Sequence, residues 1–164
     1  MDRAALKRSA VEPAGPSTPV GELREAGLHA LLGYQIAQAK IATDAVFDRS
    51  VGTPHELRPV EYTMLALIAA NAGASPSRIA TALALNKPNV TLWLGRLEAR
   101  RLIERRPSAQ DGRSIELTVT AAGARLAAEG TAALVEAERL AFDRLSAAER
   151  AMLAELLHKL AARR

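Results

Sequence analysis

Residues 105–118, RRPSAQDGRSIELT, constrain the fold of this chain more than any other feature. The second half, continued by Val119, alternates polar and apolar residues with the period of a half-buried strand. The first half begins with two arginines, and the polar stretch between the halves holds an Asp-Gly pair typical of a tight turn. These residues therefore predict a β-hairpin with Asp111 and Arg113 at its tip.

Two short helical segments lie directly upstream of this hairpin. Ser75 followed by Pro76 is a strong helix start, and the helix that it opens is short. Asn86 is placed to cap a second helix, which ends near Arg100 and tolerates Pro88 in its first turn. A helix, a break, a second helix and a basic hairpin are the elements of a winged helix-turn-helix, in their usual order.

Positive charge is concentrated on the same region. Between residues 78 and 113 the chain has eight basic and three acidic residues, a net charge of +5, whereas the whole chain carries +4. Such clustering is typical of a phosphate-binding surface, because an ordinary solvated helix face mixes the two signs more evenly.

Composition favours packed helices and narrows the class of protein. Ala and Leu supply most of the apolar content, and aromatic residues make up only 3% of the 164. The absence of cysteine excludes disulfides and thiolate chemistry. Because no long apolar run or signal-peptide pattern is present, we expect a cytoplasmic protein without a membrane partner.

Catalysis is not expected. The three histidines are scattered, and no Ser or Cys nucleophile constellation or Gly-rich phosphate loop is present. Asp44 and Asp48 stand one helical turn apart, as metal ligands can, but without His or Cys nearby we expect them to be solvated. The sequence therefore predicts neither an enzyme nor a bound metal or cofactor.

The regions before and after the central motif read as a tail and long helices. Residues 1–21 hold three prolines and two glycines and predict a flexible tail. A long helix is expected from about Glu22 to Asp48, followed by a loop over 50–58 and a helix over 59–70.

After the hairpin, Thr120 is expected to open an Ala-rich helix that reaches about Leu145. Ser146 and Glu149 form a capping box, which predicts a last helix over 147–161. That helix has an apolar stripe with few expected partners in its own chain, namely Met152, Leu153, Leu156, Leu157 and Leu160.

The second helix of the central pair has side chains suited to base edges at its N-terminal end. Asn89 can pair with adenine and Lys87 with guanine or phosphate, while Leu92 can touch a thymine methyl group. Asn86 is better explained as a helix cap than as a base contact. At the hairpin tip Arg113 can enter a minor groove with Asp111 orienting it; a simple Asp-Gly turn is the alternative.

From Leu57 to about Gly123 the chain resembles the MarR (multiple antibiotic resistance regulator) family of winged-helix transcription factors. The motifs that carry the resemblance are Arg78-Ile79-Ala80, Arg96-Leu97-Glu98, Leu102-Ile103-Glu104-Arg105, Asp111-Gly112-Arg113 and Leu117-Thr118-Val119-Thr120-Ala121-Ala122-Gly123.

The chain departs from the family pattern at three places. Pro88 and Asn89 stand where small hydroxyl residues are usual, and Leu92 replaces a residue that is often basic. Arg101 replaces a glycine just past the second helix, where a left-handed conformation is costly for a side chain.

The resemblance implies a mainly α fold. A winged helix-turn-helix lobe with a two-stranded β wing, residues 57–119, would be flanked by dimerisation helices at 22–56 and 120–164. Residues 22–164 would then form a single domain behind the tail of residues 1–21.

The resemblance also implies a sequence-specific transcriptional regulator that binds a pseudo-palindromic operator in double-stranded DNA as a homodimer. Its two recognition helices would lie about 34 Å apart. The expected DNA-binding residues are Ser75, Ser77, Arg78, Lys87, Asn89, Thr91, Leu92, Arg96, Arg105, Arg106, Asp111 and Arg113.

Many members of the family are repressors that leave DNA when a small effector fills a cleft beside the winged-helix lobe. The effector is often an aromatic acid or its aryl-CoA thioester. By position, the cleft residues here are His29, Leu32, Gly33, Ile36, His55 and Tyr62, each of which has ordinary core or surface packing as its alternative. The competing functions are a ligand-independent winged-helix regulator and a winged-helix protein-interaction module.

Overall fold

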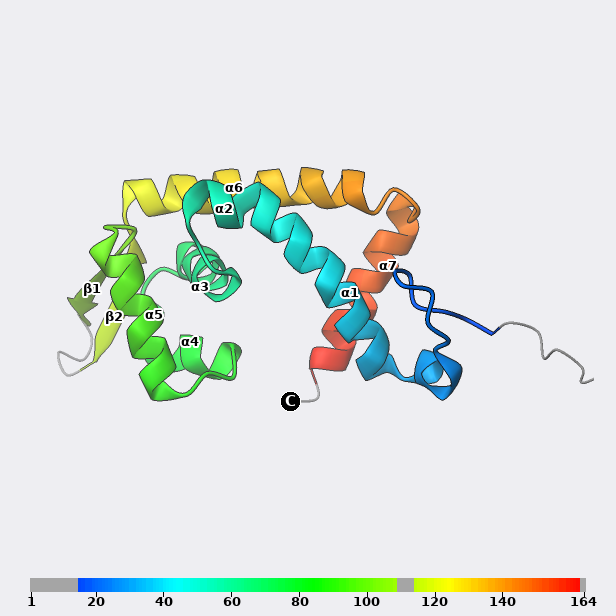
Figure 1. The fold of residues 1–164 in the computed structure, drawn as a ribbon. Coiled ribbons are helices and arrows are strands. Elements are labelled where there is room, and N and C mark those ends of the chain that lie inside the picture. Colours follow the sequence, from blue (N-terminus) through cyan, green and yellow to red (C-terminus); the bar gives the residue numbers. More distant parts are fainter. Residues whose placement is uncertain (1–14, 109–113, 163–164) are drawn as a thin grey trace, which may run out of the picture. The chain divides into compact units, whose positions relative to one another are not determined.

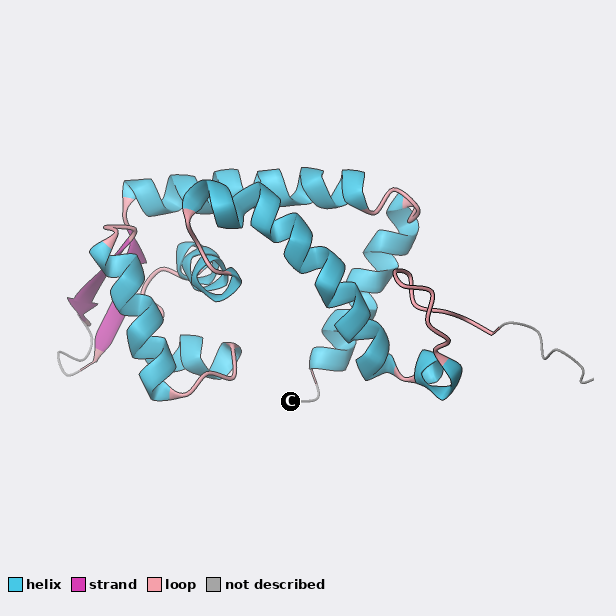
Figure 2. Ribbon diagram, in the orientation of Figure 1, coloured by secondary structure: helices cyan, strands magenta, loops and turns pink. Residues whose placement is uncertain are grey.

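The computed structural model describes residues 15–108 and 114–162, which are mainly helical with one two-stranded antiparallel sheet (Figures 1 and 2). The chain divides into two compact units, residues 1–42 and 43–164. The expected fold class, a winged helix-turn-helix with additional helices, is confirmed.

The N-terminal unit begins with a turn instead of a helix. The isolated bridge between Ser17 and Arg24 closes this turn, and the backbone N–H of Glu25 donates to the carbonyl of Pro16 at 3.0 Å. A 3-10 helix, η1 (Ala26–Ala30), follows, and α1 (Leu32–Phe47) starts only after the extended residue Leu31. The predicted helix start at Glu22 is wrong, because the local turn uses the hydrogen-bonding groups that a first helical turn would need.

The C-terminal unit starts within α1 and continues as helix where a loop was predicted. The π-helical η2 (Asp48–Gly52) and the short α2 (Thr53–His55) follow α1 without a break. Glu56 then adopts a left-handed conformation, φ +51°, and the N–H of Leu57 donates to the carbonyl of Gly52 at 3.0 Å. This pattern is a Schellman motif, which ends the helix sharply.

The winged-helix lobe follows, with helices α3 (Pro59–Ala70), α4 (Pro76–Ala82) and α5 (Lys87–Ala99). The predicted N-caps are confirmed. The Ser75 hydroxyl accepts a hydrogen bond from the backbone N–H of Arg78. The side-chain Oδ1 atom of Asn86 accepts one from the backbone N–H of Asn89. The two caps therefore define where α4 and α5 begin.

Strands β1 (Ile103–Pro107) and β2 (Ile115–Val119) form the wing. They pair antiparallel, with Ile103 opposite Val119 and Pro107 opposite Ile115. The segment before α4 extends the sheet by a single bridge, in which the N–H of Leu117 donates to the carbonyl of Ala74 at 3.0 Å. The base of the wing is thereby joined to the start of the helix-turn-helix.

The core of this unit is built around α3. Fully buried side chains come from five elements, and α3 supplies the largest share; one of them is Val51 of η2. The others are Met64, Leu65 and Ile68 of α3, Leu94 and Leu97 of α5, Ile103 of β1 and Leu117 of β2.

Helices α4 and α5 both end in a Schellman motif with a side chain at the left-handed position. Ala84 has φ +51° and Arg101 has φ +56°. Arg101 therefore adopts the left-handed conformation that is costly for a residue with a side chain. After α5, the N–H of Arg101 donates to the carbonyl of Glu98 and that of Leu102 to the carbonyl of Leu97, at 2.8 and 3.0 Å. The chain thus turns from α5 directly into β1.

Helix α6 (Ala121–Ala141) is capped by Thr120, as predicted, and ends before Leu145 because residues 142–145 form a turn. Helix α7 (Ala147–Ala161) has the predicted capping box, in which hydrogen bonds from Ser146 lower the pKa of Glu149. No residue of α7 is buried, and its five stripe residues, Met152 to Leu160, are 43–57% exposed.

The approach of α6 to the start of the wing requires a glycine. A Cβ atom at Gly123 would lie 1.9 Å from the backbone oxygen of Leu102, which no side-chain movement can relieve. We therefore expect Gly123→Ala to lower the free energy of unfolding by about 2–3 kcal/mol through steric strain. Gly95→Ala is the matched control, because a Cβ there meets nothing within 4 Å and should raise stability by about 0.5–1 kcal/mol. Chemical denaturation measures both; equal effects would contradict the close approach.

Candidate nucleic-acid interface

The first two turns of α5 present an exposed surface above a buried face. Val90, Leu94 and Leu97 are buried, whereas Lys87 and Asn89 are exposed and Leu92 is 48% exposed. Because residues one turn apart share a helix face, the core side of α5 is fixed by packing and its opposite side faces outward. The outward side carries a cation, an amide and an apolar side chain.

Two polar side chains of this region are already engaged within their own segment. The Asn86 side chain caps α5, as expected, and the Thr91 hydroxyl donates to the carbonyl of Lys87 at 3.0 Å. In α4 the hydroxyls of Ser75 and Ser77 lie 2.9 Å apart, while Arg78 is exposed. Arg78, Lys87 and Asn89 are exposed polar side chains in the N-terminal parts of α4 and α5.

The arginines at the base of the wing each have an acidic partner. The Nε atom of Arg105 lies 3.0 Å from a carboxylate oxygen of Glu98, and Arg106 donates from Nε and Nη2 to Glu104 at 3.1 and 2.5 Å. Near the tip, the Ser108 hydroxyl donates to Glu116 at 2.6 Å. Asp111 and Arg113, the predicted tip pair, lie outside the described residues.

Arg96 points toward the start of α3. Its guanidinium carbon lies 4.7 Å from the centre of the Trp93 ring, and its Nη1 atom lies 3.8 Å from the carboxylate of buried Glu61. Arg58 also lies over the same indole, at 5.3 Å. Trp93 is thus in contact with two guanidinium groups, an arrangement that favours cation–π attraction.

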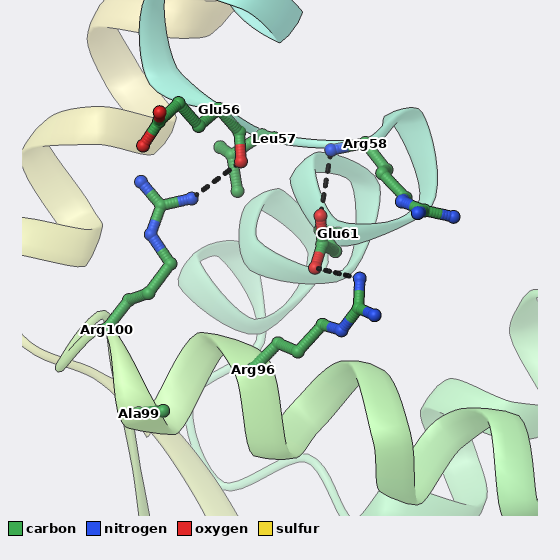
Figure 3. A pocket seen from close by; sticks show the side chains of 7 residues that line it. All are labelled: Glu56, Leu57, Arg58, Glu61, Arg96, Ala99 and Arg100. Atoms are coloured by element: carbon green, nitrogen blue, oxygen red, sulfur yellow. Dashed lines mark hydrogen bonds and ion pairs between the residues drawn. The ribbon is translucent and has the colours of Figure 1, made fainter.

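An open pocket of about 430 Å³ lies between the α2–α3 junction and the C-terminal half of α5 (Figure 3). Its lining residues are Glu56, Leu57, Arg58, Glu61, Arg96, Ala99 and Arg100. Sequence reasoning assigned no function to Glu61 or Arg100. The capping-box spacing of Arg58 and Glu61 was a usable local signal, and Glu61 indeed accepts the N–H of Arg58 at 2.8 Å.

Comparisons with known proteins agree with this geometry. The MarR family model matches residues 55–114. A transcriptional regulatory protein proposed for the hcr operon of Thauera aromatica is 31% identical over 144 residues, which cover 88% of this chain and 87% of that protein.

Solved structures match the same fold. The transcriptional repressor CouR, bound to a 23-mer DNA duplex, is 30% identical with a TM-score of 0.77, over 85% of this chain and 99% of that one. A probable transcriptional regulator from Pseudomonas aeruginosa is 26% identical with a TM-score of 0.71, over 81% and 98% of the two chains.

The chain belongs to the MarR family. It is therefore a MarR-family transcriptional regulator, and these relatives are regulators and not enzymes.

The residues that the MarR resemblance assigned to an effector cleft fall in both units. His29, Leu32, Gly33 and Ile36 belong to the N-terminal unit, and His55 and Tyr62 to the C-terminal unit.

Within the N-terminal unit, Nδ1 of His29 lies 2.5 Å from the carboxylate of buried Glu25, which also accepts the Tyr34 hydroxyl at 3.1 Å. Partial burial and the nearby Glu25 carboxylate raise the pKa of Tyr34. Leu32 and Ile36 are 67% and 40% exposed, and a Cβ at Gly33 would meet nothing within 4 Å.

Tyr62 and His55 have structural contacts in the C-terminal unit of this MarR-family chain. The Tyr62 ring is buried against Phe47 and Gly130, and its hydroxyl lies 2.6 Å from that of Thr131 in α6. The carbonyl of His55 accepts a hydrogen bond from Arg100 at 2.7 Å. Core packing, the alternative given for Tyr62, is thus what the structure describes for its side chain.

Residues 15–108 and 114–162 contain neither a metal-binding cluster nor a membrane-spanning helix. No group of three potential ligands, His, Cys, Asp or Glu, lies close enough there to hold a metal ion. Asp44 is half-buried and Asp48 is exposed. In the same ranges, no helix combines the length and apolarity needed to cross a membrane.

Proposed function

We propose that this regulator is a homodimeric repressor that binds a pseudo-palindromic operator and is released by a small effector. The observation that carries the proposal is the exposed N-terminal end of α5, held outward by a buried opposite face and followed by a wing that carries Arg105 and Arg106. In a helix-turn-helix this end of the second helix is the part that reaches base edges in the major groove.

Within this proposal the contacts have separate functions. Lys87, Asn89 and Leu92 read bases, because they are exposed on the first turns of α5. Side chains of α4 and of the wing strand β1 bind DNA phosphates and thereby fix the position of the protein along the duplex. These phosphate contacts are Ser75, Ser77, Arg78, Arg105 and Arg106. We assign Arg113 to the minor groove, with Asp111 orienting the Arg113 side chain. Thr91 and Arg96 are assigned to the rim of the interface.

The repressor assignment is supported by the relative CouR, which is a transcriptional repressor bound to DNA and shares 30% identity with this chain. The homodimer assignment is supported by α7, whose apolar stripe is exposed along its length. Because apolar stripes of this kind are usually covered by a partner, we assign residues 22–56 and 120–164 to dimerisation and residues 57–119 to DNA binding.

The effector assignment follows the MarR family pattern, in which small, often aromatic, acids or aryl-CoA thioesters release DNA. His29, Leu32, Gly33 and Ile36 support it, because the N-terminal unit leaves a histidine, two apolar side chains and an open glycine accessible. His55 and Tyr62 enter the effector assignment through the family resemblance only.

The DNA contact is tested by alanine substitution. We expect Lys87→Ala to weaken operator binding about tenfold and to reduce the slope of log Kd against log salt by about 1, since one phosphate or base contact is lost. Arg113→Ala should weaken binding about ten- to hundredfold without lowering the thermal midpoint.

Arg125→Ala removes an exposed arginine of α6 and is the control for both variants. Fluorescence anisotropy on an operator duplex gives the Kd values, and equal losses in all three variants would contradict the assigned interface.

The dimer is tested at α7. Ending the chain after Leu145 removes α7 and should convert the dimer to a monomer, because the proposed apolar contact is gone. Leu156→Glu, which places a charge in the stripe, should have the same effect with α7 present, while Glu155→Gln on the adjacent position should keep the dimer. Light scattering after size exclusion measures the mass, and a monodisperse dimer from the truncated chain would refute this assignment.

Effector release is tested in a gel-shift assay with the wild-type protein. Benzoate and benzoyl-coenzyme A are the probes, and cyclohexanecarboxylate is the non-aromatic control. We expect at least one aromatic probe to release the duplex at concentrations where the control does not. An operator complex that ignores every probe would favour a ligand-independent regulator, and no binding to any promoter fragment at low salt would favour a protein-interaction module.

A further inference from the structure

The C-terminal end of α5 is joined to the end of α2 by a single side chain. The Arg100 guanidinium donates from Nη2 to the carbonyl of His55 at 2.7 Å and from Nη1 to the carbonyl of Glu56 at 3.0 Å. Figure 3 shows this side chain extending from the end of α5 toward Glu56. The contact connects segments that lie 44 and 45 residues apart in the chain.

The two carbonyls are groups that need a donor. They lie where α2 ends at the left-handed residue Glu56, and the last carbonyls of a helix have no partner within it. A cation at this end is also favoured by the helix dipole. The planar guanidinium satisfies both carbonyls at once, which a point charge such as lysine cannot do with the same geometry.

A second contact lies one helical turn earlier on the same helix. Arg96 faces Glu61 at 3.8 Å and covers the Trp93 ring, which Arg58 covers as well. Arg96 and Arg100 are four residues apart, so they project from one side of α5 toward the α2–α3 junction. The apolar core fixes which face of α5 is buried, and these two arginines fix its position along that junction.

We propose that Arg100 is a positioning residue for operator recognition. It sets the orientation of α5 through the carbonyls of α2 and does not itself contact DNA. The inference rests on the proposed function, in which α5 is the recognition helix. Since Arg100 is exposed, its loss should change the global stability little while leaving α5 free to shift against α3.

The experiment compares Arg100→Gln with Arg101→Gln. Both remove one positive charge at the end of α5, but among the described residues the Arg101 side chain has no hydrogen-bond or ion-pair partner. We expect Arg100→Gln to weaken operator binding about tenfold with an unchanged salt slope, and Arg101→Gln to weaken it less. Arg100→Lys should give an intermediate loss of affinity, because lysine keeps the positive charge but lacks the planar group that donates to two carbonyls at once.

Trp93 provides a second measurement that needs no DNA. It is the only tryptophan of the chain and lies on α5 in contact with two guanidinium groups. In the free protein, Arg100→Gln should change the emission and acrylamide quenching of Trp93, whereas Arg101→Gln should not. If the wild type binds no operator, the proposed function fails, and this signal still tests the positioning contact.

Four results would overturn the inference. A salt slope that falls by about 1 in Arg100→Gln would make Arg100 a phosphate contact. Equal affinity losses in Arg100→Gln and Arg101→Gln, or wild-type binding by Arg100→Lys, would show that charge alone matters. Arg100 would be assigned to stability only if two results occur together. The Arg100→Gln protein would be unfolded, and the Arg100→Lys protein would be folded with unchanged Trp93 quenching.

Discussion

The winged-helix lobe depends on the apolar packing of α3. Met64, Leu65 and Ile68 are completely buried, and the elements packed against α3 are α6, α5, β2 and α4. Burial of these side chains, at roughly 1.5–3 kcal/mol each, is the main free energy that holds α5 with one face inward. The exposed face of the recognition helix is therefore a consequence of the α3 core, and a change in that core would reorient the proposed DNA contacts.

Polar contacts determine which side chains on the exposed face of the lobe remain available to bind DNA. The side chain of Asn86 defines where α5 begins, and the hydroxyl of Thr91 bonds within the helix, whereas Lys87 and Asn89 are exposed on its first turn. Arg105 and Arg106 are partly neutralised by Glu98 and Glu104. The Arg106–Glu104 pair is exposed, and exposed ion pairs are worth little in water, so a DNA phosphate can replace the Glu104 carboxylate at small cost. The Nε atom of Arg105 is buried, so the same argument does not extend to its pair with Glu98.

Local signals explain which parts of the structure could be predicted. Caps at Ser75, Asn86, Thr120 and Ser146 depend on a side chain and a backbone group three residues away, and all four were read from the sequence. The wing hairpin was predicted from the alternation in its second strand, whereas the pairing register is given by the structure. The turn before α1 was missed because it depends on a contact of Glu25 with Pro16 that helical periodicity does not reveal.

Contacts between distant segments explain what the sequence left out. The assignment of Arg96 to DNA came from its position on a basic helix, yet its neighbours Glu61 and Trp93 are visible only once α3 and α5 are packed. Arg100 looked like one more basic residue at a helix end. Its bond to carbonyls 44 and 45 residues away distinguishes it from Arg101, which has the same charge and a strained backbone. Net charge predicts that this lobe attracts phosphate, whereas the pairing of each arginine decides which side chain remains available to bind it.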